Sequence, residues 1–249
     1  MTAGFSPVAV VPVFNHPQAI AGLVAALRGH GLPVLLVDDG SEPGCAAVLR
    51  GLAAATPGQV ILERLDHNQG KGAAVMAGLR EAGRLGYSHA LQIDADGQHD
   101  PADVPRFLAM ARETPAAVIN GRPVYDASVP RGRLYGRYLT HVWVWINTLS
   151  LEISDSMCGF RVYPLAPTLA LLETARIGRR MDFDTEVLVR LHWRGLAVRD
   201  CPTRVVYPPG GVSHFRMLRD NVRISAMHTR LFFGMLLRLP RLLARKVAG

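Results

Sequence analysis

Two carboxylates, Asp94 and Asp96, stand two positions apart directly after the short apolar run of residues 90–93. In an extended chain, residues i and i+2 point to the same face, so both are expected to project together at the end of a buried strand. Gln98 adds an amide oxygen. These oxygens suit a hard cation such as Mg²⁺ or Mn²⁺. A polar turn between a strand and a helix is the alternative, because Asp and Gly favour turns.

A second acidic pair, Asp38 and Asp39, follows the apolar run of residues 34–37. Acidic groups at the end of a strand can accept hydrogen bonds from a ribose hydroxyl or a base N–H of a nucleotide. A turn with Ser41 as the cap of the next helix is the other interpretation. The segment Pro12-Val13-Phe14-Asn15 ends the first apolar run, and we expect its loop to lie beside this pair in the same ligand crevice.

The segment Asn68-Gln69-Gly70-Lys71-Gly72 precedes an expected helix. Its two glycines let the backbone come close to a ligand, the helix N-terminus favours an anion, and Lys71 adds a positive charge. The pattern is shorter than a P-loop, so it does not indicate an ATPase. Alone, such a short segment is weak evidence for any site.

Hydrophobic periodicity predicts the elements that would position these segments. We expect strands at 8–13, 34–37, 60–64, 90–93 and 116–120, alternating with helices at 17–30, 45–55, 72–85 and 102–112. This alternation predicts an α/β fold: a Rossmann-like, mostly parallel sheet with helices on both faces. Beyond residue 121 we expect a loop at 124–137, helices at 138–149 and 181–193, and a strand at 197–207.

The charge of the chain limits its partners. The formal net charge of the 249 residues is +8, and only Lys71 and Lys246 are lysines, so nearly all 28 cationic residues are arginines. Arginine matches phosphate in a bidentate manner, which suits diphosphate substrates, anionic lipid headgroups or nucleic acid. No helix-turn-helix, zinc-finger or RNA-binding aromatic pattern accompanies the charge, so we expect no nucleic-acid partner.

The cysteines and the N-terminus indicate a cellular compartment. Cys45, Cys158 and Cys201 are widely spaced and odd in number, which argues against a disulfide scaffold or a zinc site and fits a reducing environment. The first residues lack a basic stretch followed by a long apolar run, so no signal peptide is expected.

The C-terminal stretch differs in character from the rest. We divide the chain into an α/β domain, 1–216, and a basic helical tail, 217–249. The apolar run at 231–237 is far shorter than the ~20 residues that span a bilayer. A basic amphipathic helix that lies on an anionic membrane surface fits the pattern better. A core helix that caps the domain, or an oligomer contact, is the alternative.

The ordered set of strand-end segments resembles the family 2 glycosyltransferases of GT-A fold, especially the dolichol-phosphate mannosyltransferase-like and bacterial polyprenyl-phosphate glycosyltransferase branch. The resemblance covers about residues 6 to 215. Besides the segments above and Asp94-Ala95-Asp96-Gly97-Gln98, the matching motifs are Asn120-Gly121-Arg122 and Asp155-Ser156-Met157-Cys158-Gly159-Phe160-Arg161.

The resemblance implies a role for each matching residue. Asp96 and Gln98 would bind Mg²⁺ or Mn²⁺ on the diphosphate of a nucleotide-sugar, with Asp96 essential for catalysis. The implied donor-binding residues are Pro12, Phe14, Asn15, Asp38, Asp39, Gly70, Lys71, Asp94 and Asp96. The residues implied to face donor and acceptor phosphates are Arg122, Arg131, Arg133 and Arg137, with His214 in the segment that closes over the diphosphate in relatives. Asp155 and Arg161 are implied to be part of the framework on the acceptor side. His214 departs from the pattern, because relatives often have a Gly-Ser-Lys segment there, and Asn15-His16 stands where many have Asn-Glu.

Asp184 is the candidate base if the acceptor is a hydroxyl, because the wider family often places an acid there. The alternative is an ordinary acid in the first turn of a helix, where the dipole favours it. A phosphate acceptor is already an anion and needs no protein base.

Three functions follow as hypotheses. The first is an inverting, metal-dependent glycosyltransferase that moves a sugar from a nucleotide donor to a lipid-linked acceptor, peripheral on the inner face of the cytoplasmic membrane. The second is a glycosyltransferase acting on a hydroxyl of a soluble or carrier-bound acceptor. The third is a non-catalytic sugar-nucleotide-binding or scaffold protein.

Overall fold

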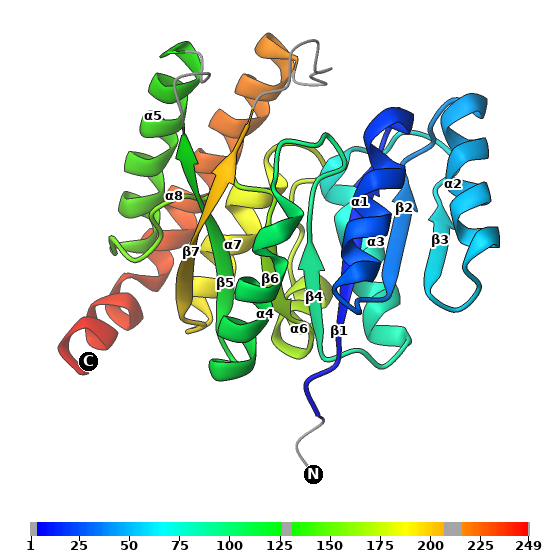
Figure 1. Ribbon diagram of the computed structural model, residues 1–249. Coiled ribbons are helices and arrows are strands. Elements are labelled where there is room, and N and C mark those ends of the chain that lie inside the picture. Colours follow the sequence, from blue (N-terminus) through cyan, green and yellow to red (C-terminus); the bar gives the residue numbers. More distant parts are fainter. Residues whose placement is uncertain (1–3, 126–130, 207–215, 249) are drawn as a thin grey trace.

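The fold is organised around one seven-stranded sheet, with strand order β3-β2-β1-β4-β6-β5-β7 (Figure 1). The computed structural model describes residues 4–125, 131–206 and 216–248, and the side chains of all of these except 131–135, 247 and 248. Helices cover both faces of the sheet, and the α/β architecture predicted from the sequence is confirmed.

The N-terminal half consists of parallel strands joined by helices. Its strands are β1 (Pro7–Val13), β2 (Val34–Asp38), β3 (Val60–Arg64) and β4 (His89–Gln92), and its helices are α1 (Pro17–Gly29), α2 (Pro43–Ala55) and α3 (Lys71–Arg84). Val13 pairs with Asp38, and Asp38 pairs with Arg64, so β1, β2 and β3 end level with one another. The polar segments that follow these strands therefore meet at one edge of the sheet.

The C-terminal half adds an antiparallel strand to the parallel sheet. Its elements are η1 (Pro101–Asp103), α4 (Val104–Glu113), β5 (Val118–Tyr125), α5 (Arg131–Thr148), β6 (Arg161–Pro164), α6 (Leu165–Thr174), α7 (Phe183–Trp193) and β7 (Val198–Val205). Strand β6 lies between β4 and β5 and is antiparallel to both, whereas β7 is parallel to β5.

One expectation for this half was wrong, and two elements were not predicted. A loop was expected at 124–137, where β5 ends and α5 begins, and neither β6 nor α6 was expected. Strand β6 has only four residues, with Arg161 at one end and Pro164 at the other, so it lacks the apolar run that identified the other strands. Helix α5 begins with Arg131 and Gly132, which resemble loop composition.

Two apolar clusters fill the spaces above and below the sheet. Successive residues of β1 alternate between them: Val8 and Val10 belong to the cluster under α3 and α7, and Ala9 and Val11 to the cluster under α1 and α4. This alternation follows from the two-residue period of a strand, and burial on both faces explains why the strands are continuously apolar.

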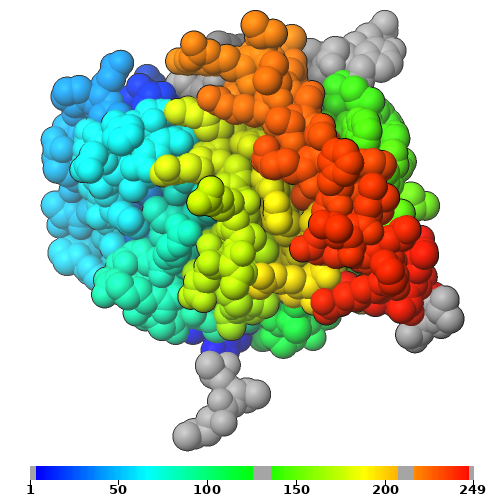
Figure 2. All heavy atoms as spheres, turned by 180° about the vertical axis from the view of Figure 1, so that it is seen from behind, coloured from blue at the N-terminus to red at the C-terminus, as the bar shows by residue number. Residues whose placement is uncertain are grey.

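Helix α8 (Met217–Ala248) forms most of the tail and crosses the back of the molecule beside α7 (Figure 2). Its inner side chains Met227, Leu231 and Met235 are buried in the same cluster as α7. The tail is therefore helical, as predicted, but it also contributes to the core. Among the described residues, no helix contains a stretch long and apolar enough to cross a bilayer.

Candidate functional site

Lys71 is the central cation of the site. It is the first residue of α3 and follows Gly70, whose φ of +106° is a conformation that favours glycine. Its Nζ lies 2.7 Å from Asp94 Oδ2 and 2.8 Å from Asp184 Oδ2. Burial alone would lower the pKa of Lys71, but the two carboxylates outweigh it and raise that pKa above its ordinary value. Lys71 is therefore a fixed positive charge between two acidic residues.

One carboxylate oxygen of Asp94 is paired with Lys71, and the other has no partner among the described residues. Oδ2 accepts from Lys71, while Oδ1 is buried and has no hydrogen-bond partner among the described residues. Burial, opposed by Lys71 and reinforced by the nearby charge of Asp96, raises the pKa of Asp94 to about 6. A Cβ at Gly159 would overlap this carboxylate, so only glycine leaves room for it.

Asp96 lies in a turn, which corrects the expected geometry. Strand β4 ends at Gln92, and residues 95–97 form a turn or bend, so Asp94 and Asp96 do not project from one face of an extended strand. Asp96 Oδ1 accepts the backbone N–H of Gln98 at 3.0 Å. The two carboxylates are still close enough for their charges to interact.

The donor atoms present fit a hard divalent cation. No group of three His, Cys, Asp or Glu side chains suited to a metal occurs in the described part of the chain. However, the unpartnered Asp94 Oδ1 and the partly exposed carboxylate of Asp96 are oxygen donors of the kind that Mg²⁺ and Mn²⁺ prefer. Such ions commonly take one or two carboxylates and complete their coordination with phosphate and water.

Asp38 and Asp39 are buried and hold neighbouring loops. Asp38 Oδ1 accepts from the backbone N–H of Ser41 at 2.8 Å, and Oδ2 pairs with Arg64. Asp39 accepts from the backbone N–H groups of Gln69 at 2.7 Å and Gly70 at 2.9 Å. Burial raises the pKa of Asp39 despite these bonds. Contact of either carboxylate with a nucleoside stays a prediction.

The loop after β1 lies beside the loop after β2, as expected. Asn15 has φ +56°, its N–H donates to Ser41 Oγ at 3.0 Å, and its Oδ1 accepts from Glu42 N at 2.9 Å. Pro12 pairs with Val37 within the sheet, and Phe14, which follows β1, is partly exposed.

Arg161 lies inside the protein, not at its surface. Its guanidinium donates to Asn120 Oδ1 at 2.8 Å, to Ser156 O at 2.5 Å and to Asp184 O at 2.5 Å. The residue is fully buried. A phosphate contact would require these bonds to break, so in this geometry Arg161 supports the first turn of α7.

Two of the other predicted arginines, Arg122 and Arg137, have described side chains. Arg137 pairs with the buried Asp155, with Nη2–Oδ1 at 2.7 Å, and Arg122 is exposed on β5. The backbones of Arg131 and Arg133 begin α5, but their side chains lie outside the described part of the structure, as does His214. Their phosphate contacts stay predictions.

Two polar residues of the site were not predicted from the sequence. Gln92 is fully buried in β4, and its Nε2 donates to Asp184 Oδ1 at 3.1 Å. His99 packs against Phe160 with ring centroids 5.6 Å apart, and burial lowers its pKa to about 4. An amide at the end of an apolar strand was the available signal for Gln92.

The chain is similar to a known family of proteins. The sequence model described as Glycosyl transferase family 2 matches residues 8–169. Polyprenol monophosphomannose synthase of Mycolicibacterium smegmatis is 28% identical over 228 residues, covering 86% of this chain and 82% of that protein. The UDP-N-acetylglucosamine–dolichyl-phosphate N-acetylglucosaminyltransferase of Methanococcus voltae is 24% identical over 214 residues, covering 80% and 84%.

Solved structures share the fold. Glucosyl-3-phosphoglycerate synthase from Mycobacterium tuberculosis superposes with a TM-score of 0.64 at 17% sequence identity, over 94% of this chain and 80% of that one.

Proposed function

Because this chain belongs to glycosyl transferase family 2, we propose that it moves a sugar, with inversion, from a nucleotide-diphosphate-sugar to a lipid-linked, polyprenyl-phosphate-like acceptor at a membrane surface. The names of two relatives support this choice of acceptor, since one is a polyprenol monophosphomannose synthase and another an undecaprenyl-phosphate mannosyltransferase.

The state of Asp184 favours a phosphate acceptor over a hydroxyl. Its Oδ1 accepts from Gln92 and its Oδ2 pairs with Lys71, and the side chain is only 6% exposed. A general base must lie within hydrogen-bond reach of the hydroxyl that it deprotonates, and here both oxygens of Asp184 already have protein partners. A phosphate acceptor requires no base, so the same carboxylate is free to position Lys71. The pairing of both Asp184 oxygens with Gln92 and Lys71 is the observation that carries the proposal.

We further propose that Asp96, Asp94 and Gln98 hold Mg²⁺ or Mn²⁺ with the donor diphosphate. When bound, the cation would neutralise charge that develops on the leaving nucleoside diphosphate. Lys71 would add a second, fixed positive charge at the same place, and a preorganised charge of this kind stabilises a transition state without reorganisation.

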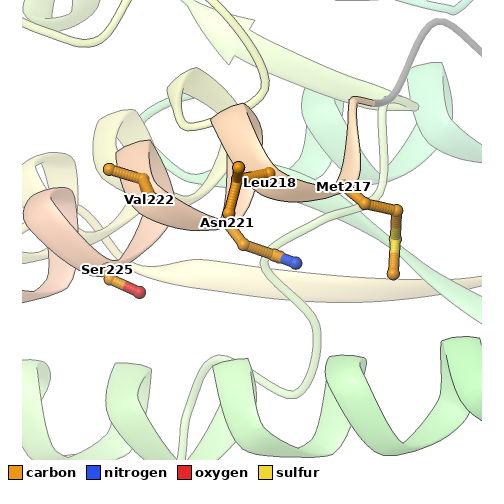
Figure 3. Close-up of a pocket in the computed structure, with 5 residues that line it drawn as sticks. All are labelled: Met217, Leu218, Asn221, Val222 and Ser225. Atoms are coloured by element: carbon orange, nitrogen blue, oxygen red, sulfur yellow. The ribbon is translucent and has the colours of Figure 1, made fainter.

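An exposed apolar surface on the tail helix α8 supports docking to a membrane. Leu218 and Leu237 of α8 are 80% and 84% exposed, and Met217, Leu218 and Val222 line a shallow hollow of about 500 Å³ (Figure 3). Helix α5 adds exposed Tyr138 and Leu139.

Basic residues accompany this apolar surface. The tail carries seven cationic residues and one acid, Asp220. Arg219, Arg241 and Lys246 are exposed. Apolar side chains flanked by cations are typical of a helix lying on an anionic bilayer, so we propose a peripheral location at such a surface.

A transfer assay tests this proposal. A thermal-shift screen of nucleotide-sugars with Mn²⁺ identifies the donor, because a bound ligand stabilises by mass action. The full chain is then assayed with that donor and either polyprenyl phosphate in detergent or hydroxyl acceptors. We expect metal-dependent transfer to polyprenyl phosphate, and at least a ~100-fold loss in Asp96→Ala.

Two outcomes would contradict the proposal. Transfer to hydroxyl acceptors alone would establish the second hypothesis and return Asp184 to the role of base. Donor binding measured by calorimetry, without transfer to any acceptor and without hydrolysis, would establish the non-catalytic sugar-nucleotide-binding protein.

A further inference from the structure

A chain of hydrogen bonds runs beneath Lys71 through the interior of the protein. Tyr163 OH donates to Gln92 Oε1 at 3.1 Å, and Gln92 Nε2 donates to Asp184 Oδ1 at 3.1 Å. Asp184 Oδ2 then pairs with Lys71 at 2.8 Å. These contacts join β6, β4, α7 and α3, and we refer to Tyr163, Gln92, Asp184 and Lys71 as the buried polar chain.

From Tyr163 to Asp184, the hydrogen bonds of the buried polar chain all donate in one direction. Arg161 Nη1 donates to Tyr163 OH at 3.4 Å, so the hydroxyl hydrogen of Tyr163 is directed to Gln92. The Gln92 oxygen thereby accepts, and its NH₂ group is turned toward Asp184. Each member fixes the orientation of the next, because an amide with its oxygen engaged offers only its nitrogen.

Packing alone does not account for Gln92 and Tyr163. Both are fully buried, and Gln92 points to the same face of β4 as Ala90, which belongs to an apolar cluster. A buried amide or hydroxyl is costly unless it is hydrogen-bonded, so an apolar residue would fill this space more simply. The polar groups are instead satisfied by one another and end at the carboxylate that holds Lys71.

We propose that Gln92 and Tyr163 are positioning residues for catalysis. They hold the Asp184 carboxylate in one orientation, and Asp184 together with Asp94 fixes the Lys71 ammonium at the edge of the sheet where the donor diphosphate is expected. Neither residue touches substrate. This inference rests on the proposed function, because the role of Lys71 toward the diphosphate belongs to it.

The kinetic test compares Gln92→Leu and Tyr163→Phe with a matched control. Thr168→Val also removes one fully buried hydroxyl, which donates to Pro164 O at 2.7 Å in α6, away from the site. We expect the first two variants to lower kcat about 10- to 100-fold, as loss of a supporting hydrogen bond does in other active sites, with KM for the donor changed less than about threefold. The control should keep its kcat within about twofold of the native value.

A second readout does not depend on transfer. The chain has only two lysines, and Lys246 is exposed, so it serves as an internal reference. The native protein is treated with an amine acylating reagent, and modification of each lysine is followed by peptide mass spectrometry. Lys71 should react slowly relative to Lys246. The ratio should rise at least about fivefold in Gln92→Leu and Tyr163→Phe, because a free amine reacts once its ion pairs loosen, and should not change in Thr168→Val.

The two readouts separate the possible failures. If the native chain transfers no sugar but the acylation ratio changes as expected, the proposed function fails and the positioning of Lys71 stands. If transfer occurs and both variants match Thr168→Val in kcat and in Lys71 reactivity, the positioning role is overturned. A variant that does not fold is identified by circular dichroism, and the other variant then decides the question.

Discussion

At the scale of single residues, Gly159 makes room for the acidic group that holds Lys71. A Cβ there would overlap the Asp94 carboxylate. We expect Gly159→Ala to displace Asp94 and to lower metal-dependent transfer about 10- to 100-fold, as displacement of a ligand-orienting group commonly does. Transfer rates at several Mn²⁺ concentrations measure the effect.

Gly44→Ala is the control for this substitution. A Cβ at Gly44, inside α2, would meet no atom within 4 Å. This variant should keep full activity and gain slight stability, since alanine is favoured over glycine in a helix. Equal activity of the two alanine variants would show that the site does not depend on the position of Asp94.

The buried carboxylate of Asp155 contributes to the stability of the fold through its charge. Burial would raise its pKa, but the hydrogen bond from His141 and the charge of Arg137 outweigh burial and hold the pKa well below its usual range. A carboxylate with a lowered pKa contributes its full stabilisation above its unfolded pKa of about 3.9, and this contribution declines as the pH falls from that value through the folded pKa.

The corresponding variant is Asp155→Asn. It leaves Arg137 buried without its charge partner, so we expect about 3–5 kcal/mol less stability at pH 7 in urea unfolding, and a somewhat smaller difference at pH 3, where the unfolded carboxyl is protonated but the folded one is still ionised. Glu81→Gln, which breaks an exposed pair with Arg84, should barely change stability. A pH-independent deficit in Asp155→Asn would contradict the ion-pair explanation.

At the scale of elements, α8 contacts α5 through a histidine that favours its neutral form. Burial lowers the pKa of His228 to about 4, its ring stacks on Trp143 at 6.0 Å, and its Nδ1 lies 3.3 Å from Asn147 Nδ2. Because the folded pKa is below the unfolded value of about 6.5, stability is present above pH 6.5 and is lost as the pH falls toward 4.

This predicts an acid-sensitive helix contact. Between pH 7.5 and pH 5 His228 should cost the native chain on the order of 2 kcal/mol, so His228→Gln should lose about that much less stability than the native chain over the same range. Chemical denaturation at both pH values measures the difference. His30→Gln, at an exposed position after α1, is the control and should follow the native chain.

The elements also show what sequence patterns can predict. The strands and helices from β1 to α4 were expected within a few residues, because buried parallel strands are continuous apolar runs and their helices are amphipathic. The polar segments at 38–39, 70–71 and 94–96 were expected to converge because the carboxyl ends of parallel strands lie at one edge of a sheet. Long-range contacts carry no local pattern, so the sequence did not indicate that Lys71 joins Asp94 to Asp184, or that Arg161 is buried.

At the scale of the whole molecule, one apolar surface extends across two helices. Trp143 of α5 contacts Phe232 of α8 with ring centroids 6.4 Å apart, and Phe232 contacts the exposed Phe233. Leu218 and Leu236 are 18 residues apart, which is five helical turns, so they share the outward face of α8. The core-facing side of α8 is separate, so surface variants can test docking while the fold stays intact.

The surface variant Leu218→Ser with Leu237→Ser should bind anionic vesicles at least about tenfold more weakly, since each fully buried leucine contributes roughly 1.5–3 kcal/mol. Co-sedimentation with vesicles containing phosphatidylserine measures binding. Val48→Ser removes a partly exposed apolar residue from α2 and should bind as the native chain does. Unchanged binding of the double variant, or equal binding to neutral vesicles, would contradict docking through this surface.

The strand order β4-β6-β5 also has a consequence for how the chain is synthesised. Residues 7–92 supply four adjacent parallel strands, but the free edge of β4 is paired only when β6, at 161–164, is available. An unpaired edge strand is prone to join another chain. We expect the ribosome-bound N-terminal half to depend on chaperones until about residue 164 has emerged, because domains longer than about 150 residues commonly expose such edges during folding.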